Sequence, residues 1–170
     1  RWYLSQQTFP ELLNRNVTQF ADKKAQMWKN KNGEIVSINY AQLGRTVKEV
    51  TCGLMELGIN AGDRVAIMSN TRPEWVWCDY GILCAAGITV CIYPTLSNHE
   101  MTYIMNDSGA KILFIEKQAD MEKCLAAASD IPALEKIIVM ENDQDFSNGK
   151  VISLKTLREI GNQLLLRERF

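Results

Sequence analysis

The feature that most constrains the fold is a series of short, almost wholly apolar runs that alternate with helical segments. The runs are RVAIM (64–68), ITVCI (88–92), KILFI (111–115) and KIIVM (136–140), separated by helix signals at about 72–86, 97–107 and 118–128. Strands that are apolar on both faces are typical of a parallel sheet buried beneath helices, with right-handed crossovers. The sequence therefore predicts the α/β class: a largely parallel sheet covered by helices on both faces.

Three similar tetrapeptides mark where helices are expected to begin. They are TFPE (8–11), TRPE (71–74) and SNHE (97–100). In such a capping box, the first side chain accepts from the amide three residues on, and the Glu reaches back. Asn39 is expected to cap a long helix that ends at Gly58, and Ser153 to cap the last one. The pattern around Lys31-Asn32-Gly33 predicts a small β-hairpin near residues 25–38.

The helix at 72–86 is apolar nearly all round, so it is expected to pack on more than one side. With the strand that follows, it forms an apolar stretch, WVWCDYGILCAAGITVCIY (75–93), that is long enough to be weighed as a membrane span. Asp79 within the stretch and Gly87 at its middle oppose that interpretation. The stretch divides naturally into a helix and a β-branched strand, which we expect instead.

Composition fits a globular domain that buries a core, because 46% of residues are apolar and 23% charged. The chain starts at Arg1 and stops at Phe170 inside a helical pattern, which predicts a fragment of a longer protein. We expect residues 1–170 to form a single amino-terminal subdomain. Its expected parts are a helix, hairpin and helix lead-in at 8–58, an alternating β/α core at 59–140, and a loop and terminal helix at 141–170.

Charge and cysteine usage exclude several classes of partner. The net charge is −1 and the basic residues are scattered, so no nucleic-acid partner is expected. The cysteines are odd in number, with no CxxC pair and no His at metal spacing, which argues against a zinc site or a disulfide framework. We expect buried, reduced thiols of a cytosolic protein. They are Cys52, Cys78, Cys84, Cys91 and Cys124.

No catalytic motif is found in the chain, which lacks GxGxxG, GxxxxGK[ST], GxSxG and HExxH. His99, the only histidine, falls in the first turn of a predicted helix, where Ser97 and Glu100 are expected to serve the cap. Glu74 and Asp79 are five residues apart on a helix and are not expected to share a face. The residues alone therefore predict no catalytic residue and no metal ligand here.

The run from Gly58 to Ile115 nevertheless resembles the amino-terminal part of the AMP-forming acyl-CoA synthetases, members of the adenylate-forming superfamily. The matching segments are INYAQL (38–43), LGINAGDRVAIMSNTRPEW (57–75) and GILCAAGITVCIYPTLSNHEMTYIMNDSGAKILFI (81–115). N-x-RPEW, IYPT and NDS-x-AK are most similar to the long-chain fatty acid–CoA ligase group. The chain departs from the usual pattern at Cys91, where many relatives have Pro, and at His99.

The resemblance implies an enzyme that activates a fatty acid with ATP and Mg²⁺ to acyl-AMP and then transfers the acyl group to CoA. In the family, the residues for this chemistry lie later in the chain, starting with a phosphate loop shortly after the position of Phe170. The fragment alone is therefore expected to be inactive. One local implication concerns CoA: the loop after the strand 88–92 would lie near it through Tyr93, Pro94 and Thr95.

Two alternatives stay open. The chain could belong to another adenylate-forming ligase, acting on an aryl, short-chain or amino acid, or it could be a non-catalytic α/β binding module. The resemblance also implies a cytoplasmic protein, and it leaves open peripheral association with the inner membrane surface and a homodimer.

Overall fold

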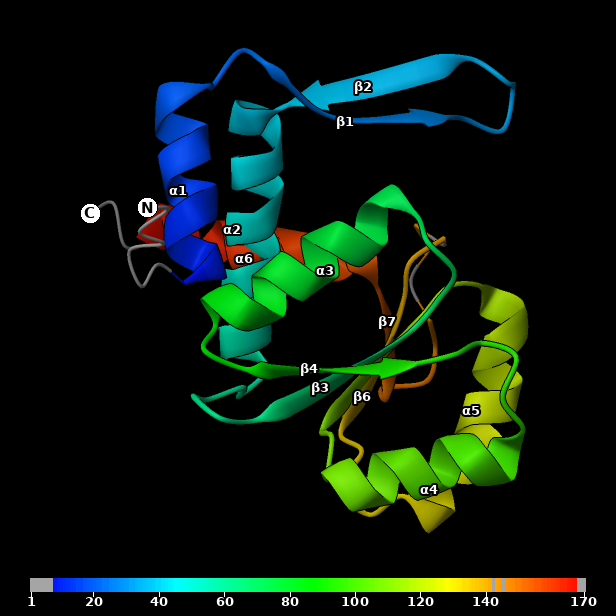
Figure 1. Cartoon of the computed structure of the whole chain (residues 1–170). Coiled ribbons are helices and arrows are strands. Elements are labelled where there is room, and N and C mark those ends of the chain that lie inside the picture. Colours follow the sequence, from blue (N-terminus) through cyan, green and yellow to red (C-terminus); the bar gives the residue numbers. More distant parts are fainter. Residues whose placement is uncertain (1–7, 142, 145, 168–170) are drawn as a thin grey trace, which may run out of the picture.

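A computed structural model of the chain describes residues 8–141, 143–144 and 146–167, and within them it contains a parallel sheet and a separate antiparallel hairpin (Figure 1). The strands are β1 (Lys24–Lys29), β2 (Ile35–Asn39), β3 (Arg64–Met68), β4 (Ile88–Ile92), β5 (Ile112–Ile115), β6 (Lys136–Val139) and β7 (Val151–Ser153). The α-helices are α1 (Phe9–Gln19), α2 (Tyr40–Glu56), α3 (Pro73–Cys84), α4 (Asn98–Ser108), α5 (Met121–Ala127) and α6 (Leu154–Arg167). Two 3-10 turns, η1 (Gln118–Asp120) and η2 (Ala128–Asp130), flank α5.

The main sheet has the order β4-β3-β5-β6-β7 among the described residues, and every neighbouring pair is parallel. β3 is hydrogen-bonded on both sides, so that Ile67 lies beside Cys91 of β4 and Phe114 of β5. The predicted fold class, with helices on both faces and a small hairpin, is confirmed. β7 was not predicted, because it is only three residues long and follows a polar loop that gives no strand signal.

Alternate residues of the central strands enter two separate cores. Ala66 and Leu113 lie in a core on the face that α4 and α5 cover. Ile67 and Phe114 lie in the opposite core, beneath α2, α3 and α6 (Figure 1). All four of these side chains are completely buried. Because both faces are covered, each strand must be apolar at every position, which is the pattern that the sequence displays.

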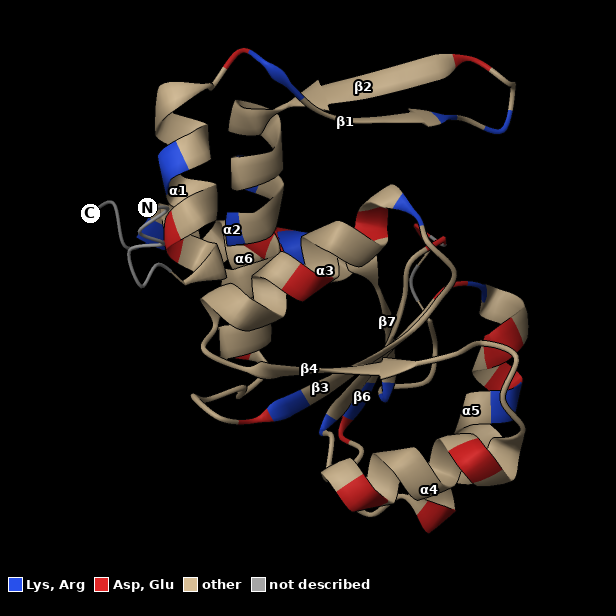
Figure 2. Ribbon diagram, in the orientation of Figure 1, with Lys and Arg blue, Asp and Glu red and all other residues tan. Residues whose placement is uncertain are grey.

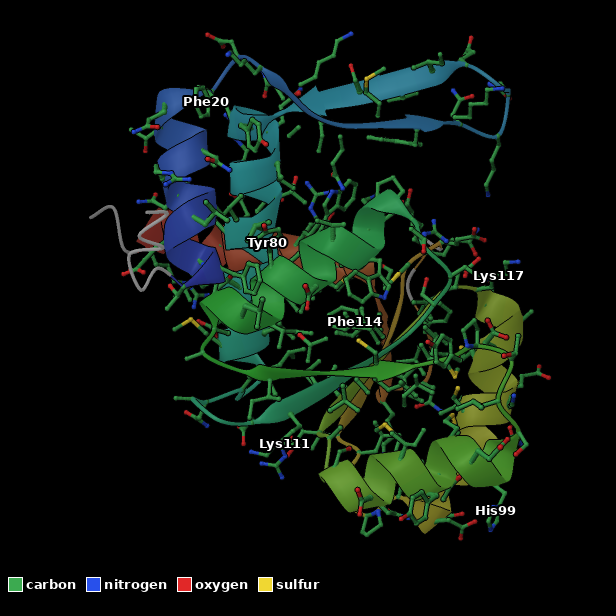
Figure 3. The ribbon with its side chains drawn as sticks, in the orientation of Figure 1. Phe20, Tyr80, His99, Lys111, Phe114 and Lys117 are labelled. Carbon is green, nitrogen blue, oxygen red and sulfur yellow. The ribbon has the colours of Figure 1, made fainter. Side chains whose placement is uncertain are left out.

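α3 lies between two groups of apolar side chains, as its all-round apolar surface predicts. Cys78 and Ile82 face the sheet, where the labelled ring of Phe114 also lies (Figure 3). Trp77 and Tyr80 also contact the smaller cluster formed by α1, α2 and the hairpin. The stretch 75–93 is thus a helix followed by a strand, and among the described residues no helix is both long and apolar enough to cross a membrane.

The capping predictions are confirmed at four helices. Thr8 and Ser97 form complete capping boxes with Glu11 and Glu100. Asn39 forms one with Gln42 at the start of α2. The hydroxyl of Ser153 accepts from the amide of Thr156 at 3.0 Å, at the start of α6.

The capping box predicted at TRPE is wrong. Arg72, and not Thr71, is the N-cap residue of α3, and its side chain makes no capping hydrogen bond. The backbone of Arg72 is extended (φ −156°, ψ 164°), as is favoured for a residue that precedes proline, and Pro73 begins the helix. Glu74 consequently does not serve a cap; its carboxylate accepts from the Arg72 guanidinium at 2.8 Å.

The expectation of buried thiols is only partly correct. Cys78 and Cys124 are buried and Cys52 and Cys84 are half-buried, but Cys91 is exposed. Cys91 lies on β4, which forms an edge of the sheet within the described residues and therefore lacks a neighbour to cover it. Burial raises the pKa of the Cys124 thiol to about 11, with a further contribution from Asp120, so this thiol stays protonated.

Close packing of α2 against α6 depends on two glycines. A Cβ atom at Gly161 of α6 would overlap the carbonyl oxygen of Glu49 and lie 2.7 Å from the amide nitrogen of Gly53. Backbone atoms cannot move aside as a flexible side chain can. On the same two helices, Arg158 donates to the carboxylate of Glu49 at 2.8 Å, which fixes their relative rotation.

We predict that Gly161→Ala destabilises the protein by ~2 kcal/mol or more, since the added methyl group forces the two helices apart. The free energy of unfolding in urea measures the effect. Gly149→Ala is the matched control, because a Cβ atom there would meet nothing within 4 Å. Equal stability of the two variants would contradict this account of the α2–α6 contact.

Candidate functional site at the carboxyl edge of the sheet

At the carboxyl ends of the neighbouring strands β3 and β5, the chain continues to opposite faces of the sheet. After β3 the chain passes to α3 on one face, and after β5 it passes to α5 on the other (Figure 1). In open α/β sheets, a crevice opens between two strands whose connections diverge in this way, and ligands bind there. The residues that follow these strands are therefore the first candidates for a functional site.

Arg72 lies at this crevice and joins three carboxylates from three different segments. Its guanidinium contacts Glu74 at 2.8 Å, Glu141 at 2.9 Å and Glu116 at 3.9 Å. Lys117 adds a second cation, 3.7 Å from Glu116. Figure 2 shows basic and acidic residues meeting where α3 begins. We call Arg72, Glu74, Glu116 and Glu141 the Arg72 cluster.

Glu116 is held from the other side by the loop that follows β3. Its carboxylate accepts from the backbone amide and the side-chain amide of Asn70, both at 2.9 Å. Burial raises the pKa of this carboxyl, but the hydrogen bonds from Asn70, with Lys117 and Arg72 nearby, outweigh it and hold the pKa below its usual range. Glu116 is consequently ionised and ties the carboxyl ends of β3 and β5 together.

The Arg72 guanidinium is also stabilised in its charged form. Its partial burial opposes the charge, but the hydrogen bonds and attraction from Glu74 and Glu141 raise its pKa overall. Each carboxylate of the cluster thus contacts a cation. Such a network positions loops; it offers neither a nucleophile nor a proton that is easily given up.

The cluster does not fit a metal ion. Among the described residues, no group of three or more His, Cys, Asp or Glu side chains is placed to hold one. The three glutamates converge on a guanidinium instead, which fills the position that a cation would need. We therefore assign no Mg²⁺ ligand to the described part of this chain.

The predicted CoA-contacting residues lie at the same edge of the sheet, after β4. Tyr93, Pro94 and Thr95 form a turn closed by a hydrogen bond from the amide of Leu96 to the carbonyl of Tyr93, at 3.1 Å. Tyr93 is 77% exposed. Lys123 of α5 donates to the carbonyl of Leu96 at 3.1 Å, which anchors the end of the turn. The turn is held firmly by its backbone and leaves its side chains free for a contact.

His99 lies on the outer side of α4, where its labelled side chain points away from the sheet (Figure 3). It is exposed, and the capping box of Ser97 and Glu100 lies beside it. A shallow groove next to it is lined by Leu96, His99, Glu100, Tyr103 and Ile104. His99 thus lies in the exposed first turn of α4, as the sequence indicates, and its lack of a catalytic role stays a prediction.

Sequence reasoning expected Tyr93, Pro94 and Thr95 to follow a parallel strand, where the structure has them, but missed the Arg72 cluster. Glu74 was interpreted as a capping residue, and the two other glutamates follow strands and lie 42 and 67 residues after it. Their shared signal was available: Glu116 and Glu141 each directly follow an apolar strand. Acidic residues at the ends of parallel strands meet at one edge, where a neighbouring Arg pairs with them.

Comparison with known proteins shows which family this chain belongs to. The profile of the family described as "AMP-binding enzyme" matches residues 13–161. A long-chain-fatty-acid–CoA ligase of Mycobacterium bovis is 33% identical over 107 residues, which are 63% of this chain and 18% of that protein. A mouse long-chain-fatty-acid–CoA ligase is 27% identical over 166 residues, covering 96% of this chain and 22% of the relative.

Solved structures show the same fold. A putative long-chain-fatty-acid CoA ligase from Rhodopseudomonas palustris superposes with a TM-score of 0.77 at 19% identity, over 91% of this chain and 37% of the other. The anthranilate CoA ligase AuaEII, solved with anthranoyl-AMP, gives a TM-score of 0.74 at 24% identity, over 88% and 26% of the two chains.

The superpositions show that this chain shares its fold with part of the solved CoA ligases. Because the family profile covers most of its length, the chain belongs to the AMP-binding enzyme family. It spans about a fifth of the length of the curated relatives that it matches.

We predict that Glu116→Gln flattens the acid limb of the stability profile, which is the fall in the free energy of unfolding as the pH decreases. The pKa of Glu116 is lower in the folded state than its ordinary value of 4.5, so the folded state binds this proton less readily than the unfolded state. The stability that this difference contributes is present above about pH 4.5 and is lost as pH falls through the folded pKa. Urea unfolding between pH 6 and pH 3 measures the loss, which the variant lacks.

The exposed Glu56 provides the control for this experiment. Glu56→Gln is expected to keep the slope of the unmodified protein, because no cation or amide is seen at its carboxylate in the described structure. An acid limb equally steep in Glu116→Gln and in the unmodified protein would show that Glu116 does not tie β3 to β5.

Proposed function

We propose that this chain is the amino-terminal subdomain of an AMP-forming long-chain fatty acid–CoA ligase. The single observation that carries the proposal is the agreement between the family profile and curated relatives named long-chain-fatty-acid–CoA ligases. The proposed reaction has two steps. A fatty-acid carboxylate attacks the α-phosphorus of ATP and releases pyrophosphate; the CoA thiol then attacks the acyl carbon and releases AMP.

The edge strand β4 supports the proposal that further chain completes this subdomain. The sequence ITVCI is mostly apolar on both faces, as a strand covered on both faces would be. In the described structure, however, Ile88 is 51% exposed and Cys91 is also exposed. An uncovered apolar edge favours aggregation, so a natural protein is expected to cover it. This argues for a longer protein and against a free-standing binding module.

The proposed roles within the described residues are structural and substrate-positioning. The Arg72 cluster joins the loops that follow β3, β5 and β6. It therefore holds in place the carboxyl edge of the sheet, next to which the turn after β4 lies. Tyr93, Pro94 and Thr95 are proposed to form part of a wall beside CoA. ATP and Mg²⁺ would be held by other parts of the protein, since no phosphate-binding loop occurs in this sequence.

ATP–pyrophosphate exchange in the full-length protein tests the proposed activity. We expect exchange that depends on hexadecanoate, because acyl-AMP formation is reversible and does not need CoA. Residues 1–170 alone are expected to give none. Exchange with benzoate or acetate but not with hexadecanoate would assign an aryl or short-chain ligase instead, and no exchange with any acid would overturn the ligase proposal.

We predict that Tyr93→Ala raises KM for CoA about five- to tenfold in the full-length enzyme and leaves kcat nearly unchanged, as expected for loss of a contact made equally before and during the reaction. Pyrophosphate exchange should not change, because it precedes CoA use. Tyr103→Ala is the matched control, since Tyr103 is 66% exposed on α4, outside the turn. An unchanged KM for CoA in Tyr93→Ala would remove this residue from the proposed wall.

We also propose a cytoplasmic protein that associates peripherally with the inner membrane surface, since its substrate would be a lipid. Flotation of the full-length protein with vesicles of anionic lipid tests the association, and light scattering tests whether it is a homodimer.

A further inference from the structure

A second site is suggested by an apolar pocket of about 310 Å³ between α1 and α2. It lies at the carboxyl end of α3, where Cys84 forms part of its wall. α3 has 12 residues, so the pocket is roughly 18 Å along that helix from the Arg72 cluster at the other end. The pocket is thus a separate feature from the carboxyl edge of the sheet.

Facing stripes of the two helices form the walls. α1 contributes Leu13 and Val17, and α2 contributes Val47. At one end the helices approach closely: a Cβ atom at Gly44 would lie 2.7 Å from a methyl group of Val17, so the pocket is closed there. A volume of this size is at the lower limit for ligand pockets, which fits a small, elongated apolar ligand.

Three lining residues carry polar side chains other than thiols: Lys48, Asn14 and Thr51, and the Thr51 hydroxyl already donates to the carbonyls of Val47 and Gly81. Lys48 is the only charged residue that lines the pocket, and Asn14 lies across from it on α1. Both side chains are exposed. In the part of the chain that the structure describes, no hydrogen bond or ion pair engages the Lys48 ammonium or the Asn14 side-chain amide. Two hydrogen-bond donors, one of them a cation, thus stand at the entrance of an apolar space.

We propose that this pocket binds a medium-chain fatty acid, with the alkyl chain between α1 and α2 and the carboxylate at Lys48 and Asn14. Charge complementarity selects this ligand among amphiphiles. An alkylammonium ion would be repelled by Lys48, and a neutral alcohol would offer the ammonium a hydrogen-bond acceptor but no opposite charge. A nucleotide would place polar groups against apolar walls without hydrogen bonds to satisfy them. The proposal does not depend on the proposed ligase activity.

The cysteines supply a readout specific to this pocket. Cys52 and Cys84 both line it, whereas Cys91 lies on β4 and does not line it. A bound alkyl chain should therefore shield the first two thiols from alkylation and leave the third unaffected. Alkylation of the full-length protein with N-ethylmaleimide at mildly alkaline pH, followed by mass spectrometry of each cysteine peptide, measures the three rates.

We expect octanoate to slow alkylation of Cys84 at least about fivefold in a saturable manner, without slowing that of Cys91. Octyltrimethylammonium and octanol at the same concentrations should protect Cys84 much less. In Lys48→Glu, the order should reverse, so that the cation protects and octanoate does not. In Lys48→Ala, the octanoate concentration for half-protection should rise about tenfold.

Circular dichroism checks that both Lys48 variants fold, which is expected because this side chain is exposed. Equal protection by octanoate, octanol and octyltrimethylammonium would overturn the carboxylate assignment. Unchanged protection by octanoate in Lys48→Glu would do the same. Absence of protection of both Cys52 and Cys84 by octanoate would mean that octanoate does not bind in the pocket, and this result also overturns the proposal.

Discussion

The rest of the structure depends on β3 being hydrogen-bonded on both edges and buried on both faces. Its neighbours β4 and β5 follow it in sequence, so the chain must cross from one side of β3 to the other, and α3 and α4 must lie on opposite faces. Each face then demands its own apolar core, which accounts for strands apolar at every position. The same strand order sends the connections after β3 and β5 to opposite faces, and polar side chains lie in the crevice between them.

The fold could be predicted largely because its signals are local. Thr8, Asn39, Ser97 and Ser153 each cap a helix through neighbours within three residues, and the apolar runs require burial wherever they lie. Predictions failed where a distant partner decides the outcome. Arg72 takes the N-cap position without a capping hydrogen bond, and its side chain contacts Glu74 and also Glu141, 69 residues later in the chain. No local pattern contains that information.

The candidate site shows the same division. The turn at Tyr93-Pro94-Thr95 follows a strand, so its position at the carboxyl edge could be anticipated. The Arg72 cluster had only a partial signal, the acidic residues after two apolar runs, because its members meet only when the sheet order brings β3, β5 and β6 side by side. Cys91 was likewise misjudged: an apolar run indicates a buried strand, but the position of β4 at the edge of the described sheet depends on the strand order, which the run does not reveal.

The two regions differ in what their charges can do. At the carboxyl edge, every glutamate of the Arg72 cluster contacts a cation, so the charges there hold loops together and have little capacity left for a ligand. At the mouth of the α1–α2 pocket, Lys48 stands beside apolar walls with no carboxylate among the lining residues. An unneutralised charge next to an apolar surface is the arrangement that recognises an amphiphile. The cluster therefore serves structure, whereas the pocket has the unmet charge and the free volume that a ligand requires.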